Sequence, residues 1–423
     1  MSTLNLGRAG GAALAVVAAL AVFSSGCAKD ALVNPPDALK ARALDASIQP
    51  AVNQVVAGAN QFALDFYGQL RTQPGNIFCS PQNISTAFAM TCAGASGTTR
   101  DEMVRVFHFP QLGDTLHAAW GAVLASLNRG ATLGGYELSL ANRLWGQQDF
   151  TFLQPFLDIT RKSYGAELQR LDFLHDPGGS RSTINTWVEN QTHGRIQNLM
   201  PPDAVTNATR LVLTSAIYFK GLWATQFDAR NTVPAPFHVA PGVERNVPTM
   251  SAELDCSEGR GTGVGLLELP YRGKDLSMVI LLPDSLDGLA GLEDRLDAAS
   301  LDAWIAGLHA TRMRVMLPKF TVTTYVSLVS MLQALGMQAA FVPGDADFSL
   351  MDGGRDLFIS AAVHKAWVQV NEEGTEAAAA TGVSVGVTSV PPGFVVNHPF
   401  LFLIRDNVTG SLLFLGRVTD PSS

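Results

Sequence analysis

The strongest constraint on the fold is that residues 52–421 contain no linker, no charge block and no internal repeat. Within this span, helical patterns of apolar residues and runs typical of buried strands follow one another without a βαβ order. A chain of this kind is expected to form one large α+β body, although single cores seldom grow beyond about 300 residues.

A few segments give clear secondary-structure predictions. Helical spacing of apolar side chains predicts a helix over residues 52–70, which Pro74 and Gly75 end. A second helix is expected within residues 182–191 for the same reason. Segments rich in apolar residues predict buried strands at residues 211–219, 276–282 and 357–370.

The N-terminus has the pattern of an export signal. Arg8 precedes an uncharged apolar run over residues 9–23, which is too short to span a bilayer comfortably. Residues 1–26 are therefore expected to be a cleaved signal peptide. The small residues before Cys27 resemble a bacterial lipobox, in which the cysteine is lipidated, although Ser24 stands where Leu or Val is usual. Plain secretion with Cys27 unmodified is the alternative.

Residues 27–50 contain the pair Pro35-Pro36 and no long apolar period, so they are expected to form a tether ahead of a body at residues 51–423. The protein is then exported, either to the cell envelope or to the extracellular space. Contact with a membrane is expected only through a lipid on Cys27.

Composition excludes several classes of function. Lys+Arg 29 against Asp+Glu 37 gives a net charge of −8, which argues against a nucleic-acid binder. Four cysteines in 423 residues are too few for a disulfide-built scaffold, and Cys79 and Cys92 lie in apolar segments that suit a core. The eight histidines lack metal-ligand spacing and the common nucleotide motifs are missing, so no metal and no cofactor are expected.

One short motif imitates a hydrolase. Gly382, Ser384 and Gly386 match G-x-S-x-G, in which the serine sits on a sharp turn between a strand and a helix. Pro391 and Pro392 follow closely, however, and the segment between cannot be such a helix. A Ser384 hydrolase is therefore the least favoured hypothesis, and no residue of the chain is expected to be catalytic.

The segment at residues 371–396 is the most informative. Its odd positions from 375 to 387 are Thr, Ala, Ala, Thr, Val, Val and Val, whereas the even positions are small or polar. That alternation suits a strand with one buried face, but alanine and glycine are poor strand formers. The pattern indicates a segment that can exist as a loop or as a strand. A permanent strand ending at Pro391 is the alternative.

The start of this segment resembles the reactive-loop hinge of an inhibitory serpin. The resembling residues are Glu372, Glu373, Gly374, Thr375, Glu376, Ala377, Ala378, Ala379, Ala380 and Thr381. Other stretches resemble serpin motifs in the family's order, among them residues 76–81, 142–145, 184–188, 216–221, 364–366, 398–400 and 415–417. The resemblance implies one domain with three β-sheets, eight or nine helices and an exposed reactive loop.

The resemblance also implies a polar cluster where the main sheet must open, formed by Ser80, Asn83, Ser215 and His364. The family usually has a serine where Asn83 stands and an asparagine where Ser215 stands. The two residue types are exchanged here, so a hydrogen-bonded cluster with His364 is expected to survive with the roles swapped.

The scissile bond is expected between Thr388 and Ser389. Counting sixteen residues on from Glu372 reaches Thr388, and counting back eight from Asn397 reaches Ser389. A bond one residue earlier, after Val387, is the alternative. The residues that flank the bond are Val385, Val387 and Val390. Val385, Val387 and Thr388 suit a small apolar pocket.

The implied function is suicide inhibition of serine proteases. The partner is a target protease held in a covalent complex, of elastase-like or subtilisin-like type, or of papain-like cysteine type through Val387. The inhibitor is expected to be a monomer. No heparin activation is expected, because residues 112–130 contain one basic residue, Arg129. A non-inhibitory serpin that acts as a carrier or binding module is the alternative.

Overall fold

The computed structural model describes residues 44–375 and 393–423. The expected signal peptide, Cys27 and most of the tether lie outside the described residues, as do residues 376–392. Leu44 and Ile48, which precede residue 51, pack against the core. No helix of the two described stretches is both long and apolar enough to cross a membrane.

The described residues contain ten α-helices, one more than the upper expectation. Two are short, α8 with six residues and α11 with four. The prediction of a helix at residues 52–70 is confirmed, with a start three residues earlier at Gln49, and the prediction at residues 182–191 is confirmed by α7. The helices are α2 (Gln49–Leu70), α3 (Pro81–Cys92), α4 (Gly97–Val106), α5 (Thr115–Thr132), α6 (Gln154–Tyr164), α7 (Pro177–Gln191), α8 (Leu289–Asp294), α9 (Ala298–Ala306), α10 (Leu328–Ala334) and α11 (Ser349–Asp352).

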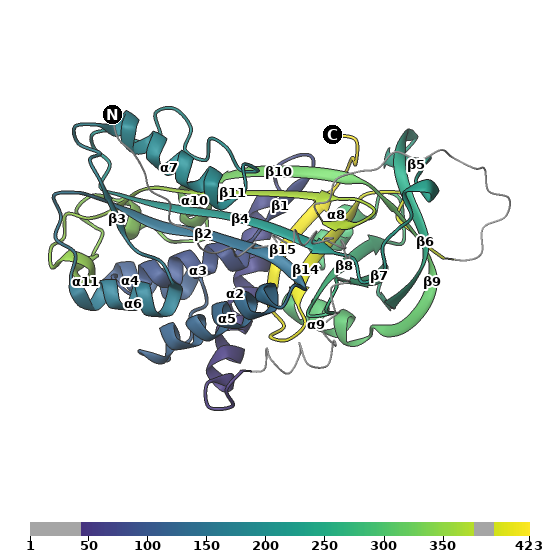
Figure 1. Cartoon of the computed structure of the whole chain (residues 1–423), viewed down its shortest axis with the longest axis horizontal. Coiled ribbons are helices and arrows are strands. Elements are labelled where there is room, and N and C mark those ends of the chain that lie inside the picture. Colours follow the sequence, from purple (N-terminus) through teal and green to yellow (C-terminus); the bar gives the residue numbers. More distant parts are fainter. Residues whose placement is uncertain (1–43, 376–392) are drawn as a thin grey trace, which may run out of the picture. The chain divides into compact units, whose positions relative to one another are not determined.

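A six-stranded sheet carries the candidate site, in the order β10-β11-β12-β4-β2-β3. In Figure 1 it runs between α7 on one side and the helices from α2 to α6 on the other. The predicted strands at residues 211–219 and 357–370 are β4 and β11 of this sheet. Its strands are β2 (Tyr136–Gln147), β3 (Gln169–Leu171), β4 (Leu211–Leu222), β10 (Phe320–Ser327), β11 (Ile359–Val370) and β12 (Gly374–Thr375).

The other strands form a nine-stranded sheet with two arms that share β6. One end of β6 pairs with β5 and its middle with β9, while its last residues pair with β7. The six-stranded sheet and the two arms of the nine-stranded sheet together correspond to the three sheets that were expected. The nine strands are β1 (Ile77–Cys79), β5 (Val233–Ala240), β6 (Val243–Gly261), β7 (Val264–Pro270), β8 (Leu276–Pro283), β9 (His309–Pro318), β13 (Gly393–Val395), β14 (Phe400–Asp406) and β15 (Leu412–Val418).

Strand alternation divides the apolar side chains between two cores. On β2, Leu138 and Leu140 pack on the larger core with α2, α3 and α5, whereas Ala141 and Trp145 face the smaller core under α7. Cys79 and Cys92 are buried and unpaired, as predicted. The six-stranded sheet is therefore covered by apolar packing on both faces.

Candidate functional site

The two central strands of the six-stranded sheet part from each other partway along. β4 and β11 pair in parallel from Leu211 to Ile217 and from Ile359 to Ala366. Beyond that point Thr375 takes the space between them, opposite Val370 on β11 and Gly221 on β4. The sheet thus holds the first residues of an additional strand between two strands that are otherwise neighbours.

A tight turn brings the chain back into this gap. The side-chain oxygen of Asn371 accepts from the N–H groups of Glu373 and Gly374, at 3.1 and 3.3 Å. The N–H of Asn371 donates to the carbonyl of Gly374 at 2.9 Å. A Cβ atom at residue 374 would collide with the carbonyl oxygen of Gly221, so only glycine lets the chain enter this close to β4.

Two aromatic residues line the entry point. The hydroxyls of Tyr271 and Thr375 are 2.7 Å apart, and both side chains are buried. The Trp223 ring stacks on Tyr271 with centroids 4.8 Å apart, and its Nε1 donates to the carbonyl of Asn371 at 2.9 Å. Burial raises the pKa of Tyr271, so its hydroxyl stays protonated and remains able to donate.

The carboxylate of Glu372 anchors the turn to residues that lie just outside the strands, ahead of β5 and between β9 and β10. Lys319 Nζ lies 2.9 Å from Glu372 Oε2, and the Thr232 hydroxyl donates to Oε1 at 2.8 Å. The carbonyl of Glu372 accepts from Phe227 N–H at 2.9 Å. Burial pushes the pKa of Glu372 upward, but the hydrogen bonds from Lys319, its own backbone and Thr232 outweigh burial and lower the pKa overall.

A polar row crosses the sheet where β4 and β11 are still paired. Asn142 on β2 stands opposite Ser215 on β4, and Ser215 stands opposite His364 on β11. Ser80 and Asn83, at the start of α3, lie against this row (Figure 1 places α3 against the sheet). Ser80, Asn83, Ser215 and His364 are fully buried, so every unmet hydrogen bond among them is costly.

Hydrogen bonds connect the row into one network. The Asn83 amide donates to the Ser215 hydroxyl at 2.9 Å, and the Asn142 amide donates to Asn83 Oδ1 at 2.7 Å. The Ser215 hydroxyl lies 3.1 Å from His364 Nδ1. His364 Nε2 accepts from the Ser80 N–H at 3.1 Å.

The network determines the protonation of His364. Since Nε2 accepts from a backbone N–H, the ring proton must be on Nδ1, which faces the carbonyl and hydroxyl oxygens of Ser215. Burial lowers the pKa of His364 to about 4, although the hydrogen bond to the Ser215 carbonyl opposes the shift. The imidazole is therefore neutral at neutral pH.

The structure brings together the four cluster residues named from the sequence and places Glu372, Glu373, Gly374 and Thr375 at the gap. The remaining hinge residues, the Thr388–Ser389 bond, its flanking valines and Cys27 lie outside the described residues. Sequence reasoning missed Asn142, Trp223, Tyr271, Thr232 and Lys319 as parts of the site. Only Asn142 carried a local signal, since it is polar on the face of β2 that also presents Leu138 and Leu140.

The described residues contain no group of three histidine, cysteine or acidic side chains placed to hold a metal ion. What they do contain is an α+β fold whose central sheet is parted between two strands and holds the start of a further strand. That combination defines the class of protein to which the chain belongs.

The comparisons with known proteins give the family. The family model "Serpin (serine protease inhibitor)" matches residues 57–421. The human leukocyte elastase inhibitor is 42% identical over 383 residues, which cover 88% of this chain and 100% of that protein. Human serpin B3 is 37% identical over 394 residues, with 88% and 100% covered. The chain therefore belongs to the serpin family, which is named for the inhibition of serine proteases.

Solved structures agree with this assignment. Uncleaved ovalbumin matches with a TM-score of 0.80 and 31% identity, covering 87% of this chain and 100% of ovalbumin. A highly specific serpin of the insect Tenebrio molitor matches with a TM-score of 0.78 and 33% identity, covering 87% and 98% of the two chains.

Proposed function

We propose that this protein is a suicide inhibitor of serine endopeptidases. A target protease attacks the carbonyl carbon of Thr388, the Thr388–Ser389 bond breaks, and an acyl-enzyme forms on the protease serine. The hinge then continues into the parted sheet as a full strand and carries the protease with it before water can release it. The inhibitor acts as a monomer and without heparin.

The observation that carries this proposal is the position of Thr375 between Val370 and Gly221. The strand has already begun to enter between β4 and β11, so its next residues can follow in the same direction. Each further residue then forms backbone hydrogen bonds with both of these strands. The residues that follow up to 381 are small apart from Glu376, which suits rapid insertion. Relatives such as the human leukocyte elastase inhibitor are named for inhibiting a protease.

The proposed targets are elastase-like or subtilisin-like serine proteases. Residues 375–396 contain no lysine or arginine, so a trypsin-type pocket with a buried aspartate finds no charge to pair with. Val385, Val387 and Thr388 instead offer small side chains to a small apolar pocket. A papain-like cysteine protease is a further possible target through Val387.

The test mixes the full chain with an elastase-like protease and examines the products by denaturing electrophoresis. An SDS-stable complex of the two chains, with release of a peptide beginning at Ser389, is expected. Trypsin serves as the matched protease and should give no such complex. Cleavage without a covalent complex would contradict the inhibitor proposal and support the carrier alternative. A released peptide beginning at Thr388 would move the bond one residue earlier.

We also propose that the protein is exported and anchored by a lipid on Cys27. The basic residue, the short apolar run and the small residues before Cys27 support this location. Labelled palmitate should enter the wild type and not the Cys27→Ser variant. Equal labelling of the two proteins would leave plain secretion.

A further inference from the structure

The segment that joins α7 to β4 lies across one face of the six-stranded sheet. We call residues 192–210 the connector; they follow Gln191 at the end of α7 and precede Leu211 at the start of β4. Apolar residues of α7 and of the connector, such as Val188 and Ile196, belong to the smaller core, whereas α3 packs on the larger core. The connector and the polar row therefore lie on opposite faces of the sheet, as the positions of α7 and α3 in Figure 1 show.

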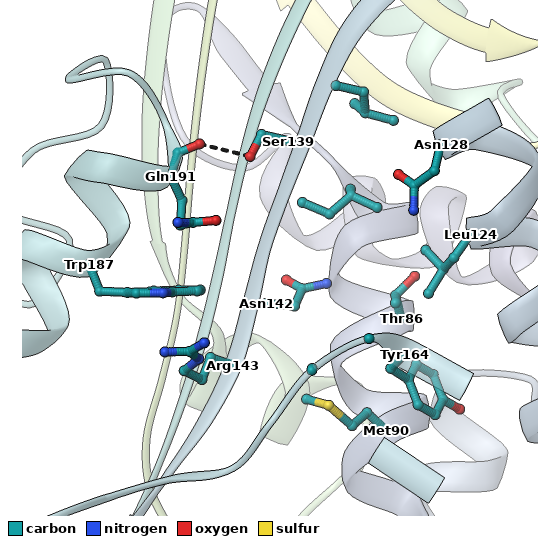
Figure 2. Close-up of a pocket in the computed structure, with 14 residues that line it drawn as sticks. Thr86, Met90, Leu124, Asn128, Ser139, Asn142, Arg143, Tyr164, Trp187 and Gln191 are labelled. Atoms are coloured by element: carbon teal, nitrogen blue, oxygen red, sulfur yellow. Dashed lines mark hydrogen bonds between the residues drawn. The ribbon is translucent and has the colours of Figure 1, made fainter. Parts of the chain in front are cut away.

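One half of the sheet, formed by β2, β3 and β4, holds α7. The Arg143 guanidinium lies 4.3 Å from the centre of the Trp187 ring, and the Ser139 hydroxyl donates to the Gln191 carbonyl at 2.7 Å. Figure 2 shows both contacts between β2 and α7. Since β2 and β4 pair along most of their length, they move as one unit when β4 and β11 part.

The same half of the sheet holds the connector as far as His193. The Nε2 atom of His193 lies 2.9 Å from a carboxylate oxygen of Glu137 on β2, and its ring meets the Tyr218 ring of β4 edge to face, with centroids 4.9 Å apart. His193 and Gly194 both have left-handed backbone angles, with φ of 50° and 75°. Two consecutive left-handed residues change the direction of the chain sharply, so the connector turns at this point.

The other half of the sheet holds the connector just after this turn. The Arg195 guanidinium lies 5.0 Å from the centre of the Trp367 ring, and Lys365 Nζ donates to the Gln197 carbonyl at 2.9 Å. Trp367 and Lys365 are both on β11, two positions apart and therefore on the same face of the sheet. The connector thus crosses from β4 to β11 at Gly194, over the line along which these strands would part.

Insertion of a strand between β4 and β11 pulls these two sets of contacts apart. Neighbouring strands are about 4.8 Å apart, so one additional strand moves β11 about that far from β4. The Arg195–Trp367 pair is already 5.0 Å apart, and cation–π attraction acts within about 6 Å. This pair must therefore break while the connector stays with β4. The Arg143–Trp187 pair lies entirely on the β2 side and is not stretched.

We propose that Arg195 and Trp367 form a latch that ties the connector to β11 and slows the opening of the sheet. This inference rests on the proposed function, because it concerns the insertion step. Both are positioning residues, since they act through the strands and do not touch the protease. When the sheet opens, α7 remains on β2 and β4, and the connector releases β11. The sheet is then held closed on both faces, by the polar row on one side and by the latch on the other.

The test measures opening of the sheet by hydrogen exchange on the full chain, without a protease. Exchange of the backbone amides that join β4 to β11 reports how often the two strands separate. Arg195→Met should raise the exchange rate of these amides about two- to fivefold, as expected for the loss of one partly exposed cation–π contact. Arg195→Lys keeps a cation over the ring and should exchange at close to the wild-type rate.

Arg143→Met is the matched control. It also removes a guanidinium from the face of a tryptophan, but on the side of the sheet that does not move relative to α7. Exchange of the amides between β4 and β11 should be unchanged in this variant. Equal exchange in Arg195→Met and in the wild type, or an equal increase in both methionine variants, would overturn the proposal.

A second variant tests whether Arg195 acts through Trp367. Trp367→Leu should raise the same exchange rates, and Arg195→Met should add little when Trp367 is already replaced. Independent effects of the two substitutions would contradict a latch made of this pair. The outcome is separable from the proposed function, because exchange needs no protease. If Arg195→Met speeds exchange but no protease gives an SDS-stable complex, the latch stands and suicide inhibition fails. If the complex forms but exchange is unchanged, the latch alone is wrong.

Discussion

Ser215 and His364 stand directly opposite each other on β4 and β11, and the Ser215 hydroxyl lies 3.1 Å from His364 Nδ1. These are the two strands between which Thr375 enters at the far end of the sheet. Any strand that continued from Thr375 along the sheet would have to separate Ser215 from His364. The polar row therefore holds closed the line along which the proposed insertion opens the sheet.

The buried neutral His364 predicts a loss of stability in mild acid. The pKa of His364 is about 4 in the folded state, whereas an unfolded histidine titrates near 6.5. Above about pH 6.5 both states are neutral, and between about pH 6.5 and 4 the unfolded state binds the extra proton. Stability should thus fall as the pH falls through this window, by on the order of 3 kcal/mol in total.

The measurement compares urea unfolding of the wild type and of His364→Gln at about pH 7.5 and pH 5. His117 and His398 also have lowered pKa values because they are buried, and they remain in both proteins. The difference between the two pH dependences therefore isolates His364. An equal pH dependence in the two proteins would show that His364 is not the buried neutral base described here.

The exchanged pair Asn83 and Ser215 predicts a compensating double variant. Asn83→Ser removes the acceptor of Asn142 and the donor to Ser215, and Ser215→Asn crowds the Asn83 amide, so each should cost about 1–3 kcal/mol. The double variant exchanges the two residue types while keeping one amide and one hydroxyl at the site, and its destabilisation should be smaller than the sum of the two. Denaturant unfolding of the four proteins measures this. Simple additivity would mean that the two side chains do not share one hydrogen-bonded site.

The anchor of the hinge predicts a difference between two neighbouring glutamates. Glu372→Lys places a cation beside Lys319 and removes the acceptor of Thr232, so the free energy of unfolding should fall by about 2–4 kcal/mol. Glu373→Lys makes the same change of charge at an exposed side chain that has no ion pair in the described structure, and it should cost under about 0.5 kcal/mol. Equal effects in the two variants would contradict the anchoring role of Glu372.

The buried hydroxyl pair at the entry point predicts a coupled loss. Tyr271→Phe leaves the Thr375 hydroxyl buried without its partner and should cost about 1–2 kcal/mol. Thr375→Val removes the other hydroxyl with little change of shape. In a double-mutant cycle, the second substitution should cost clearly less once the first is present. Independent effects would show that the two hydroxyls do not interact.

Local patterns predicted the helices α2 and α7 and the strands β4, β8 and β11, but not the whole site. The strand at residues 211–219 could be predicted because it is rich in apolar residues and buried on both faces. The strand at residues 357–370 could be predicted from its apolar residues, although only one of its faces is almost entirely buried. The family resemblance then supplied Ser80, Asn83, Ser215 and His364. Nothing in the spacing of the sequence says that Ser215 and His364 lie opposite each other on neighbouring strands, or that Ser80 and Asn83 at the start of α3 lie against them.

The residues that were missed depend on pairing between distant segments. Tyr271 meets Thr375 across 104 positions of sequence, and Trp223 meets Asn371 across 148. Each looks like an ordinary core aromatic in its own segment. Their part in the site follows from strand order and register, which periodicity does not reveal.

The last prediction concerns the residues that follow Thr375. The Thr375 side chain is buried and bonded to Tyr271 on the core side of the sheet. Because side chains alternate along a strand, Ala377 and Ala379 would enter on the same side if the hinge continued into the gap, and Ala378 would enter on the opposite side. Position 377 is therefore sensitive to size and charge in the proposed mechanism.

Ala377→Glu should convert the inhibitor into a substrate. Insertion would carry a carboxylate into the core beneath the sheet, where an unpaired charge is costly, while attack on the Thr388–Ser389 bond is unaffected. The variant should be cut by an elastase-like protease and give little SDS-stable complex. Ala378→Glu is the matched control, because it adds the same charge one position later on the opposite face, and it should retain more of the complex. If both variants trap the protease as well as the wild type, the strand does not insert in the register set by Thr375. The inhibition would then need another explanation, because the buried contact between Thr375 and Tyr271 determines which alternate residues of an inserted hinge face the core.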